Sequence, residues 1–157
     1  MTDRAAIMVF LANMASSWFL AGLIWTIQVV HYPLFARVGR EGFAAYESAH
    51  TRLITLVVGP VMLCEALAAV LLVAHRPRFV PAWAAWTMLA LLAAIWASTW
   101  ALQVPMHAVL GRGFDEAAHE RLVTTNWIRT AAWSARAALL AWLAFVALAA
   151  AREATPA

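Results

Sequence analysis

The stretch that decides the fold is AAIMVFLANMASSWFLAGLIWTIQVV, residues 5–30, which contains no charged side chain. The hydrocarbon core of a bilayer is about 30 Å thick, and a helix needs about 20 mainly apolar residues to cross it. The stretch is also far longer than the apolar region of a cleavable signal peptide, which has roughly 7–15 residues. We therefore predict that residues 5–30 form a transmembrane helix.

Three more stretches of the same kind follow. Residues 53–74 contain one charge, Glu65; residues 79–106 contain none; residues 130–151 contain one, Arg136. Of the 157 residues, 65% are hydrophobic and 12% are charged, whereas soluble domains have about 45–50% apolar and about 25% charged residues. The sequence therefore predicts a single transmembrane domain over residues 1–157, an all-α, integral membrane four-helix bundle.

Four spans place both chain termini on one face of the membrane. We call this face side A; it also carries the short turn at residues 75–78. The two longer connections, at about residues 31–52 and 107–129, lie on the opposite face, side B. All 11 basic residues are Arg and are spread along the chain, so we expect no nucleic-acid partner. We expect a multi-pass protein of a bacterial cytoplasmic membrane, surrounded by the lipid bilayer, and homo-oligomerisation is left open.

The two halves of the chain resemble each other, over units at about residues 5–75 and 79–151. WTIQ at residues 25–28 is echoed by WALQ at residues 100–103, and a histidine follows each. ESAHTRLIT at residues 47–55 and EAAHERLVT at residues 116–124 are identical at six of nine positions. Because most matches fall on Glu, His, Arg, Gln and Trp, we predict that the bundle is built from two parallel two-helix repeats. Such repeats are related by an axis along the membrane normal.

The repeated polar residues indicate a metal site at side B. Residues three apart share a helix face, so each Glu-x-x-His pair offers one oxygen and one nitrogen in the same direction. Metal sites in the cores of helix bundles use this spacing. Imidazole and carboxylate ligands do not distinguish Fe, Cu, Mn and Zn. We predict a mono- or dinuclear transition-metal site formed by His31, Glu47, His50, His107, Glu116 and His119.

Other repeated polar residues are expected to support this site. Gln28 and Gln103 precede the histidines at the ends of the first and third spans by about one helical turn. They would orient those imidazoles or form hydrogen bonds between helices. Arg52 and Arg121 would hold an anionic substrate or cofactor carboxylates, or reach the lipid head groups.

Glu65 and Arg136 are the two charges placed deep in the predicted spans. With the halves aligned, they differ in depth by about 3 Å at about 1.5 Å per residue. A single charge at that depth is costly. We therefore predict a structural ion pair between the second and fourth spans, with a proton relay as the alternative.

Three short motifs lie in the second half: PMHAVL at 105–110, NWIRT at 126–130 and WSAR at 133–136. They resemble the small four-span membrane proteins of the anthrone oxygenase-like group, in which a Pro-x-Asn/His-x-x-Leu segment precedes a Trp and an Arg in the last span. The resemblance implies a cofactor-poor oxygenase acting on a lipophilic aromatic substrate, with His107 and Trp127 near the site. His107 stands where the group often has Asn.

From the residues themselves we expect a metal-dependent, oxygenase-like oxidoreductase. Its lipophilic small-molecule substrate would enter from the bilayer, and no catalytic residue is assigned. One alternative is a b-type haem protein for electron transfer, with paired histidines as axial ligands and Arg52 and Arg121 on the propionates. The others are a metal or proton transporter, which the lack of polar residues towards side A disfavours, and a non-catalytic membrane subunit.

Overall fold

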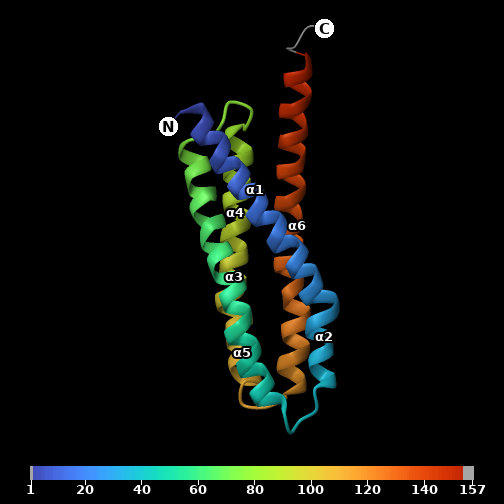
Figure 1. Cartoon of the computed structure of the whole chain (residues 1–157). Helices are drawn as coiled ribbons and strands as arrows, with labels where there is room; N and C mark the ends of the chain where they lie inside the picture. Colours follow the sequence, from blue (N-terminus) through green and yellow to red (C-terminus); the bar gives the residue numbers. More distant parts are fainter. Residues whose placement is uncertain (1, 154–157) are drawn as a thin grey trace.

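The computed structural model describes residues 2–153, and within them the chain is helical, with short turns and no β-strand (Figure 1). Four helical spans are long and apolar enough to cross a membrane: Asp3–Arg37, Phe43–Ala74, Ala82–Leu110 and Glu116–Glu153. The shortest has 29 residues, more than the about 20 that a bilayer requires. The prediction of an all-helical chain with four candidate membrane spans is therefore confirmed.

The first and third spans are subdivided, whereas the second and fourth are continuous helices. The first span consists of α1 (Asp3–Thr26), η1 (Ile27–His31), α2 (Tyr32–Leu34) and η2 (Phe35–Arg37). The second is α3 (Phe43–Ala74). The third consists of α4 (Ala82–Ser98), η3 (Thr99–Gln103) and α5 (Val104–Leu110). The fourth is α6 (Glu116–Glu153). Helix α1 runs obliquely, so that the first span packs on α3 near side A and lies beside α6 at side B (Figure 1).

The first and third spans each contain a π-helical turn close to side B. These turns are η1 and η3, and each ends two residues before a proline, Pro33 or Pro105. Proline lacks a backbone N–H, and its ring crowds the carbonyl four residues earlier, so an α-helical ladder cannot continue unchanged through it. The wider turn accommodates this crowding. Single π-helical turns inside α-helices are frequent at functional sites.

Local signals set the ends of the spans. The Thr2 hydroxyl accepts a hydrogen bond from the N–H of Ala5 at 3.4 Å, and an Asp115 carboxylate oxygen accepts one from the N–H of Ala118 at 2.7 Å. Such caps satisfy free N–H groups at helix starts. Gly39, with φ +88°, and Gly113, with φ +144°, each turn one of the side-B connections, in a backbone region that glycine enters without steric cost. The connections can therefore stay short.

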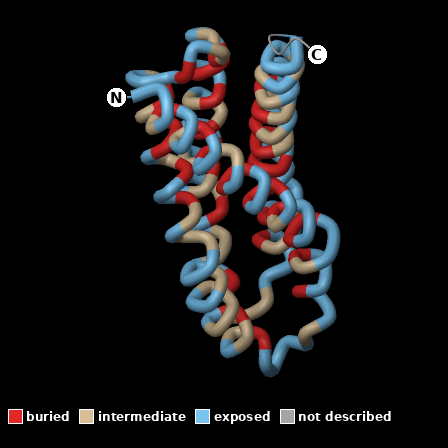
Figure 2. Tube along the Cα trace, turned by 45° about the horizontal axis from the view of Figure 1, so that its top comes forward, coloured by how far each residue is buried: buried red, intermediate tan, exposed pale blue. Residues whose placement is uncertain are grey.

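The core has two apolar clusters with a polar layer between them. The cluster nearer side A includes Phe10, Leu72, Met88 and Leu140. The cluster nearer side B includes Leu20, Phe35, Phe43, Leu122 and Trp133. The layer between them contains Asn13, Ser17, Glu65 and Arg136, all buried. The outer faces expose large apolar side chains such as Leu56 and Phe145, as expected where lipid is the solvent. Exposed and buried residues alternate along the helices (Figure 2).

Candidate active site

A chain of hydrogen bonds joins three side chains at the side-B end of the bundle. The Tyr32 hydroxyl of α2 lies 3.0 Å from Nε2 of His107 on α5. Nδ1 of His107 lies 2.5 Å from Oε1 of Glu47 on α3, and both Tyr32 and Glu47 are buried. A carboxylate only accepts hydrogen bonds, so His107 donates from Nδ1 and its Nε2 accepts the Tyr32 proton. This is the arrangement of an acid–base pair whose imidazole is oriented by a carboxylate.

Arg129 of α6 bonds to the same hydroxyl. Its Nη2 donates to the Tyr32 oxygen at 3.4 Å, and its Nη1 donates to Oγ1 of Thr99 at 3.3 Å. Its Nε and Nη2 donate to Oδ1 of Asn126 at 2.9 Å and 2.7 Å. The guanidinium also lies 5.9 Å from the centroid of the Trp133 ring, within reach of a cation–π interaction. The guanidinium therefore bonds to the same hydroxyl oxygen that contacts His107.

Two further histidines lie beside the hydrogen-bonded chain. Nε2 of His31 and Nδ1 of His50 are 2.9 Å apart, and the rings of His50 and His107 have centroids 5.7 Å apart. The structure thus brings together four of the six predicted metal ligands, His31, Glu47, His50 and His107.

The other two predicted ligands, Glu116 and His119, lie apart from this cluster. Nε2 of His119 donates to the backbone carbonyl of Tyr32 at 2.8 Å, and its ring packs against Phe35 and Phe114. Glu116 is exposed. His119 therefore bonds to the backbone of the site, and Glu116 lies outside the hydrogen-bonded chain.

The two Glu-x-x-His motifs also differ in their place in the helix. Glu47 is the fifth residue of α3, which begins at Phe43. Glu116 is the first residue of α6. The same motif therefore lies about one helical turn closer to the helix start in α6, where the glutamate side chain faces outwards.

The arrangement bears directly on the predicted metal centre. Among residues 2–153, no group of three or more His, Cys, Asp or Glu side chains is placed to hold a metal ion. Both ring nitrogens of His107 are engaged, one by Tyr32 and one by Glu47. Metal ligation through Nε2 of His107 would require the Tyr32 hydroxyl to move away.

Gln28 and Gln103 join the first and third spans to α6. Nε2 of Gln28 donates to the carbonyl of Val123 at 3.1 Å, and its Oε1 accepts from Nδ2 of Asn126 at 2.8 Å. Nε2 of Gln103 donates to Oγ1 of Thr125 at 3.0 Å. In the described residues these bonds run between helices, and none of them reaches a histidine.

Arg52, Arg121 and Trp127 lie outside the cluster. All three are exposed, and the Trp127 ring meets the Trp25 ring edge-on with centroids 5.5 Å apart. Their predicted contact with a substrate or cofactor therefore receives no support from the geometry at Tyr32.

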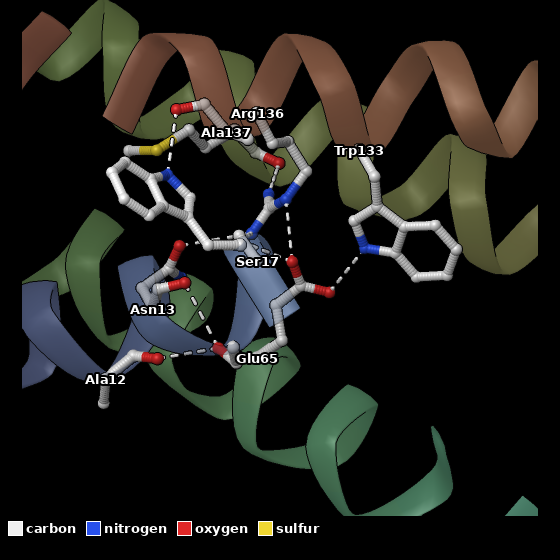
Figure 3. A network of polar contacts seen from close by, with 10 residues as sticks. Ala12, Asn13, Ser17, Glu65, Trp133, Arg136 and Ala137 are labelled. Carbon is white, nitrogen blue, oxygen red and sulfur yellow. Dashed lines mark hydrogen bonds and ion pairs between the residues drawn. The ribbon is translucent and has the colours of Figure 1, made fainter. Parts of the chain in front are cut away.

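Glu65 and Arg136 form an ion pair in the polar layer (Figure 3). Arg136 Nε lies 3.1 Å from Glu65 Oε1, and both side chains are fully buried. Ser17 Oγ donates to Glu65 Oε1 at 2.6 Å, and Trp133 Nε1 donates to Glu65 Oε2 at 3.1 Å. Arg136 also donates to Ser17 Oγ and to Asn13 Oδ1, each at 3.2 Å. Such dense hydrogen bonding is what a buried ion pair needs to offset its desolvation.

A cavity of about 450 Å³ opens next to Tyr32 inside the bundle, within the usual range of small-molecule pockets. Its lining is mostly apolar, with residues such as Leu20, Ile24, Ile54, Val58, Met62 and Trp133. Its polar residues include Tyr32, His50, Thr99, Gln103, His107 and Arg129. Leu63 and Trp100 line it and are each 63% exposed. The cavity therefore reaches the outer face between α3 and η3, where lipid would lie.

Three buried polar atoms at this site have no hydrogen-bond partner among the described residues. They are Oε2 of Glu47, Oε1 of Gln103 and Nε1 of Trp96. Gln103 and Trp96 both line the cavity. Buried polar atoms are rarely left unpaired, so a bound molecule with polar groups would satisfy them.

Tyr32 and Arg129 are the residues of this candidate site that the sequence patterns did not single out. Tyr32 lies between His31, a predicted ligand, and Pro33. In the other half, the residue before Pro105 is Val104, so the tyrosine is not repeated and a search for repeats does not find it. Arg129 lies in the NWIRT motif at residues 126–130, where no role of its own was predicted for it. The available signal was the spacing of Asn126 and Arg129, which places both on one helix face.

Comparisons with protein-family models, with curated proteins and with solved structures found no match to this chain.

Proposed function

We propose that the chain is a membrane-embedded enzyme that acts on a lipophilic small molecule by acid–base chemistry at Tyr32. One observation carries the proposal: the Tyr32–His107–Glu47 hydrogen-bonded chain borders a cavity that is otherwise mostly apolar. An apolar pocket with a few convergent polar groups is the usual form of a small-molecule site. The exposed lining residues Leu63 and Trp100 support entry of the substrate from the bilayer.

The proposed proton path has two steps. His107 Nε2 accepts the Tyr32 proton, and Glu47 stabilises the imidazolium that forms. The Tyr32 phenolate then accepts a proton from an O–H or activated C–H bond of the substrate, whose electron pair remains on the substrate as an anion. Positioned proton transfer of this kind contributes typically 10²–10⁴-fold to a rate.

We further propose that the overall reaction is the oxygenase-like oxidation expected from the sequence. Dioxygen would be the co-reactant and oxidant, and the substrate anion formed at Tyr32 would be oxidised. A substrate carbanion at a CH₂ position would add dioxygen to give a peroxide anion. With the proton returned from the His107 imidazolium, this peroxide would lose water, so one oxygen atom stays on the product as a carbonyl and the other leaves as water.

An isotope experiment tests both the proton abstraction and the oxygenation. Purified protein in lipid nanodiscs is incubated in D₂O with a panel of lipophilic ketones, phenols and carboxylic acids under labelled dioxygen, and the products are analysed by mass spectrometry. Gain of deuterium at carbon reports proton abstraction, and gain of labelled oxygen reports oxygenation. We expect at least one compound to gain one of the two labels.

The variants Tyr32→Phe and Tyr46→Phe make a matched pair. Tyr46 is also at the side-B end and only half-buried, and it lies outside the hydrogen-bonded chain. We expect Tyr32→Phe to lower label gain by about 100-fold or more, and Tyr46→Phe to leave it unchanged. A panel that gains no label, or full activity in Tyr32→Phe, would refute the proposal.

A metal-dependent oxidoreductase is the second candidate. It is favoured by the approach of His31 Nε2 to His50 Nδ1 at 2.9 Å and by the unpartnered Oε2 of Glu47 close by. Metal analysis of the purified protein, compared with His31→Ala/His50→Ala, tests it. Stoichiometric Fe, Cu, Mn or Zn that is lost in the double variant would support it, and a strong Soret band would favour the haem alternative. Metal-free active protein would refute it.

We also propose that the chain arose by duplication of a two-helix unit and acts in a bacterial cytoplasmic membrane. The recurrence of a π-helical turn before a proline in both halves supports the duplication. When the two π-helical turns are aligned, Pro33 falls on Pro105. In that alignment, the two Glu-x-x-His motifs are shifted relative to each other by about one helical turn.

A further inference from the structure

Two arginines are buried in α6, and only one of them has a carboxylate partner. Arg136 pairs with Glu65 at 3.1 Å. Arg129 is 8% exposed, and among residues 2–153 no carboxylate forms an ion pair with it. Its hydrogen-bond partners, Asn126, Thr99 and Tyr32, are all neutral. A buried charge without a counter-charge is costly, which indicates that Arg129 has a function that requires its charge.

The bonds of Arg129 leave one edge of the guanidinium weakly held. The edge formed by Nε and Nη2 is fixed on Asn126 at 2.9 Å and 2.7 Å. The bonds from Nη1 to Thr99 and from Nη2 to Tyr32 are long, at 3.3 Å and 3.4 Å, whereas N–H···O bonds cluster near 2.9–3.0 Å. The Nη1–Nη2 edge is therefore free to exchange two weak bonds for two strong ones.

An anion is the kind of ligand that fits the Nη1–Nη2 edge of Arg129 inside the cavity. Arg129 lines the cavity, and its lining contains no other Arg or Lys and no Asp or Glu. The unpartnered Nε1 of Trp96 adds a second donor, three residues before Thr99 on the same span. A planar carboxylate matches one guanidinium edge with two parallel hydrogen bonds. A phosphate, with its larger charge, would need further cations that this cavity lacks.

We propose that the ligand of this cavity is a lipophilic carboxylic acid, bound as its carboxylate on Arg129 with its apolar body among Leu20, Ile54, Val58 and Met62. The inference rests on the proposed function, because it assigns the substrate class of the same cavity. The carboxylate would lie next to Tyr32, so the proton removed by the phenolate would come from a position close to the acid group.

A quenching experiment measures binding without turnover. Trp96, Trp100 and Trp133 line the cavity, so a brominated ligand inside it quenches their fluorescence. The probes are dibromostearate and its methyl ester, added to protein in nanodiscs of zwitterionic lipid at mildly alkaline pH. Unbrominated stearate competes for the specific site and separates it from partition into the lipid. We expect the acid to bind at least tenfold more tightly than the ester.

Three variants test the role of the charge. Arg129→Gln should remove the preference for the acid and leave binding of the ester unchanged. Asn126→Asp should do the same, because it supplies a carboxylate to Arg129 and keeps the cation in place. This second variant is informative even if Arg129→Gln fails to fold. Arg52→Gln, which removes an exposed arginine of side B, should keep the full preference.

The outcomes separate this inference from the proposed function. Equal affinity for acid and ester in the wild type would overturn it, as would a preference that survives both Arg129→Gln and Asn126→Asp. A tenfold preference that disappears in these variants supports it, even if no panel compound gains deuterium or oxygen. In that case the proposed enzyme activity fails, and the carboxylate site stands.

Discussion

Glu47 Oε1 lies 2.5 Å from His107 Nδ1, although the two residues are 60 positions apart in the chain. The bond connects α3 to α5 and fixes which nitrogen of the imidazole faces Tyr32. The orientation of the proposed base therefore depends on one buried carboxylate.

The variant Glu47→Gln tests this dependence. An amide in place of the carboxylate cannot stabilise the imidazolium that forms when Tyr32 loses its proton. We expect label gain by the substrate to fall about 10²- to 10⁴-fold, measured by the same mass spectrometry. Glu116→Gln is the control, because Glu116 carries the same motif but is exposed. An equal loss in both variants would remove Glu47 from the proposed mechanism.

The ion pair of Glu65 and Arg136 gives a prediction about stability. Removing one partner of a buried pair leaves an uncompensated charge and costs about 3–5 kcal/mol. We expect Arg136→Leu to lower the free energy of unfolding by about that amount. Glu65→Gln combined with Arg136→Gln should cost less, because no charge is left behind. Unfolding in mixed micelles with a rising fraction of denaturing detergent measures both, and equal damage would contradict the pairing.

The cavity can be blocked from within. Val58 lines the cavity, whereas its neighbour Val57 is 47% exposed on the outer face. Phenylalanine at position 58 would fill part of the cavity, so Val58→Phe should weaken binding of dibromostearate at least tenfold. Val57→Phe adds the same ring on the lipid side and should leave binding unchanged. Indistinguishable binding in the two variants would argue that the ligand lies elsewhere.

The two glutamines differ in how completely they are bonded. Gln28 bonds to Val123 and Asn126, whereas Gln103 bonds to Thr125 and leaves its Oε1 unpaired. Leucine at position 28 would leave Nδ2 of Asn126 without its hydrogen-bond acceptor. An unsatisfied buried polar group costs about 1–3 kcal/mol. We expect Gln28→Leu to destabilise the protein more than Gln103→Leu in the same unfolding assay. The reverse order would contradict this account.

Much of the fold could be predicted because lipid imposes a simple rule. A segment such as residues 5–30 has no charge and must satisfy its own backbone, which leaves a helix as the outcome. The similar depth of Glu65 and Arg136 could be predicted only by aligning the two halves of the chain. The first argument uses one helix alone, whereas the second compares two helices.

The site was harder to predict, because it depends on how the helices are rotated. The repeat predicts that Glu47 and Glu116 occupy equivalent positions. In the structure, Glu47 is the fifth residue of α3, whereas Glu116 is the first residue of α6. Which histidines meet depends on how each helix is rotated about its axis. His31, His50 and His107 lie together, whereas His119 bonds to the Tyr32 carbonyl. The role of Tyr32 follows from contacts with α5 and α6, which no pattern within its own segment reveals.

The π-helical turns have a consequence for how this protein could change. Each accommodates one extra residue, and one residue corresponds to about 100° of rotation in an α-helix. The segments after η1 and η3, which carry Tyr32 and His107, are thus rotated relative to a regular α-helical continuation of α1 and α4. A one-residue insertion or deletion there would redirect the chemical groups and leave the lipid-facing pattern of the spans intact. Selection could then alter the proposed reaction while the membrane-spanning segments remain constant.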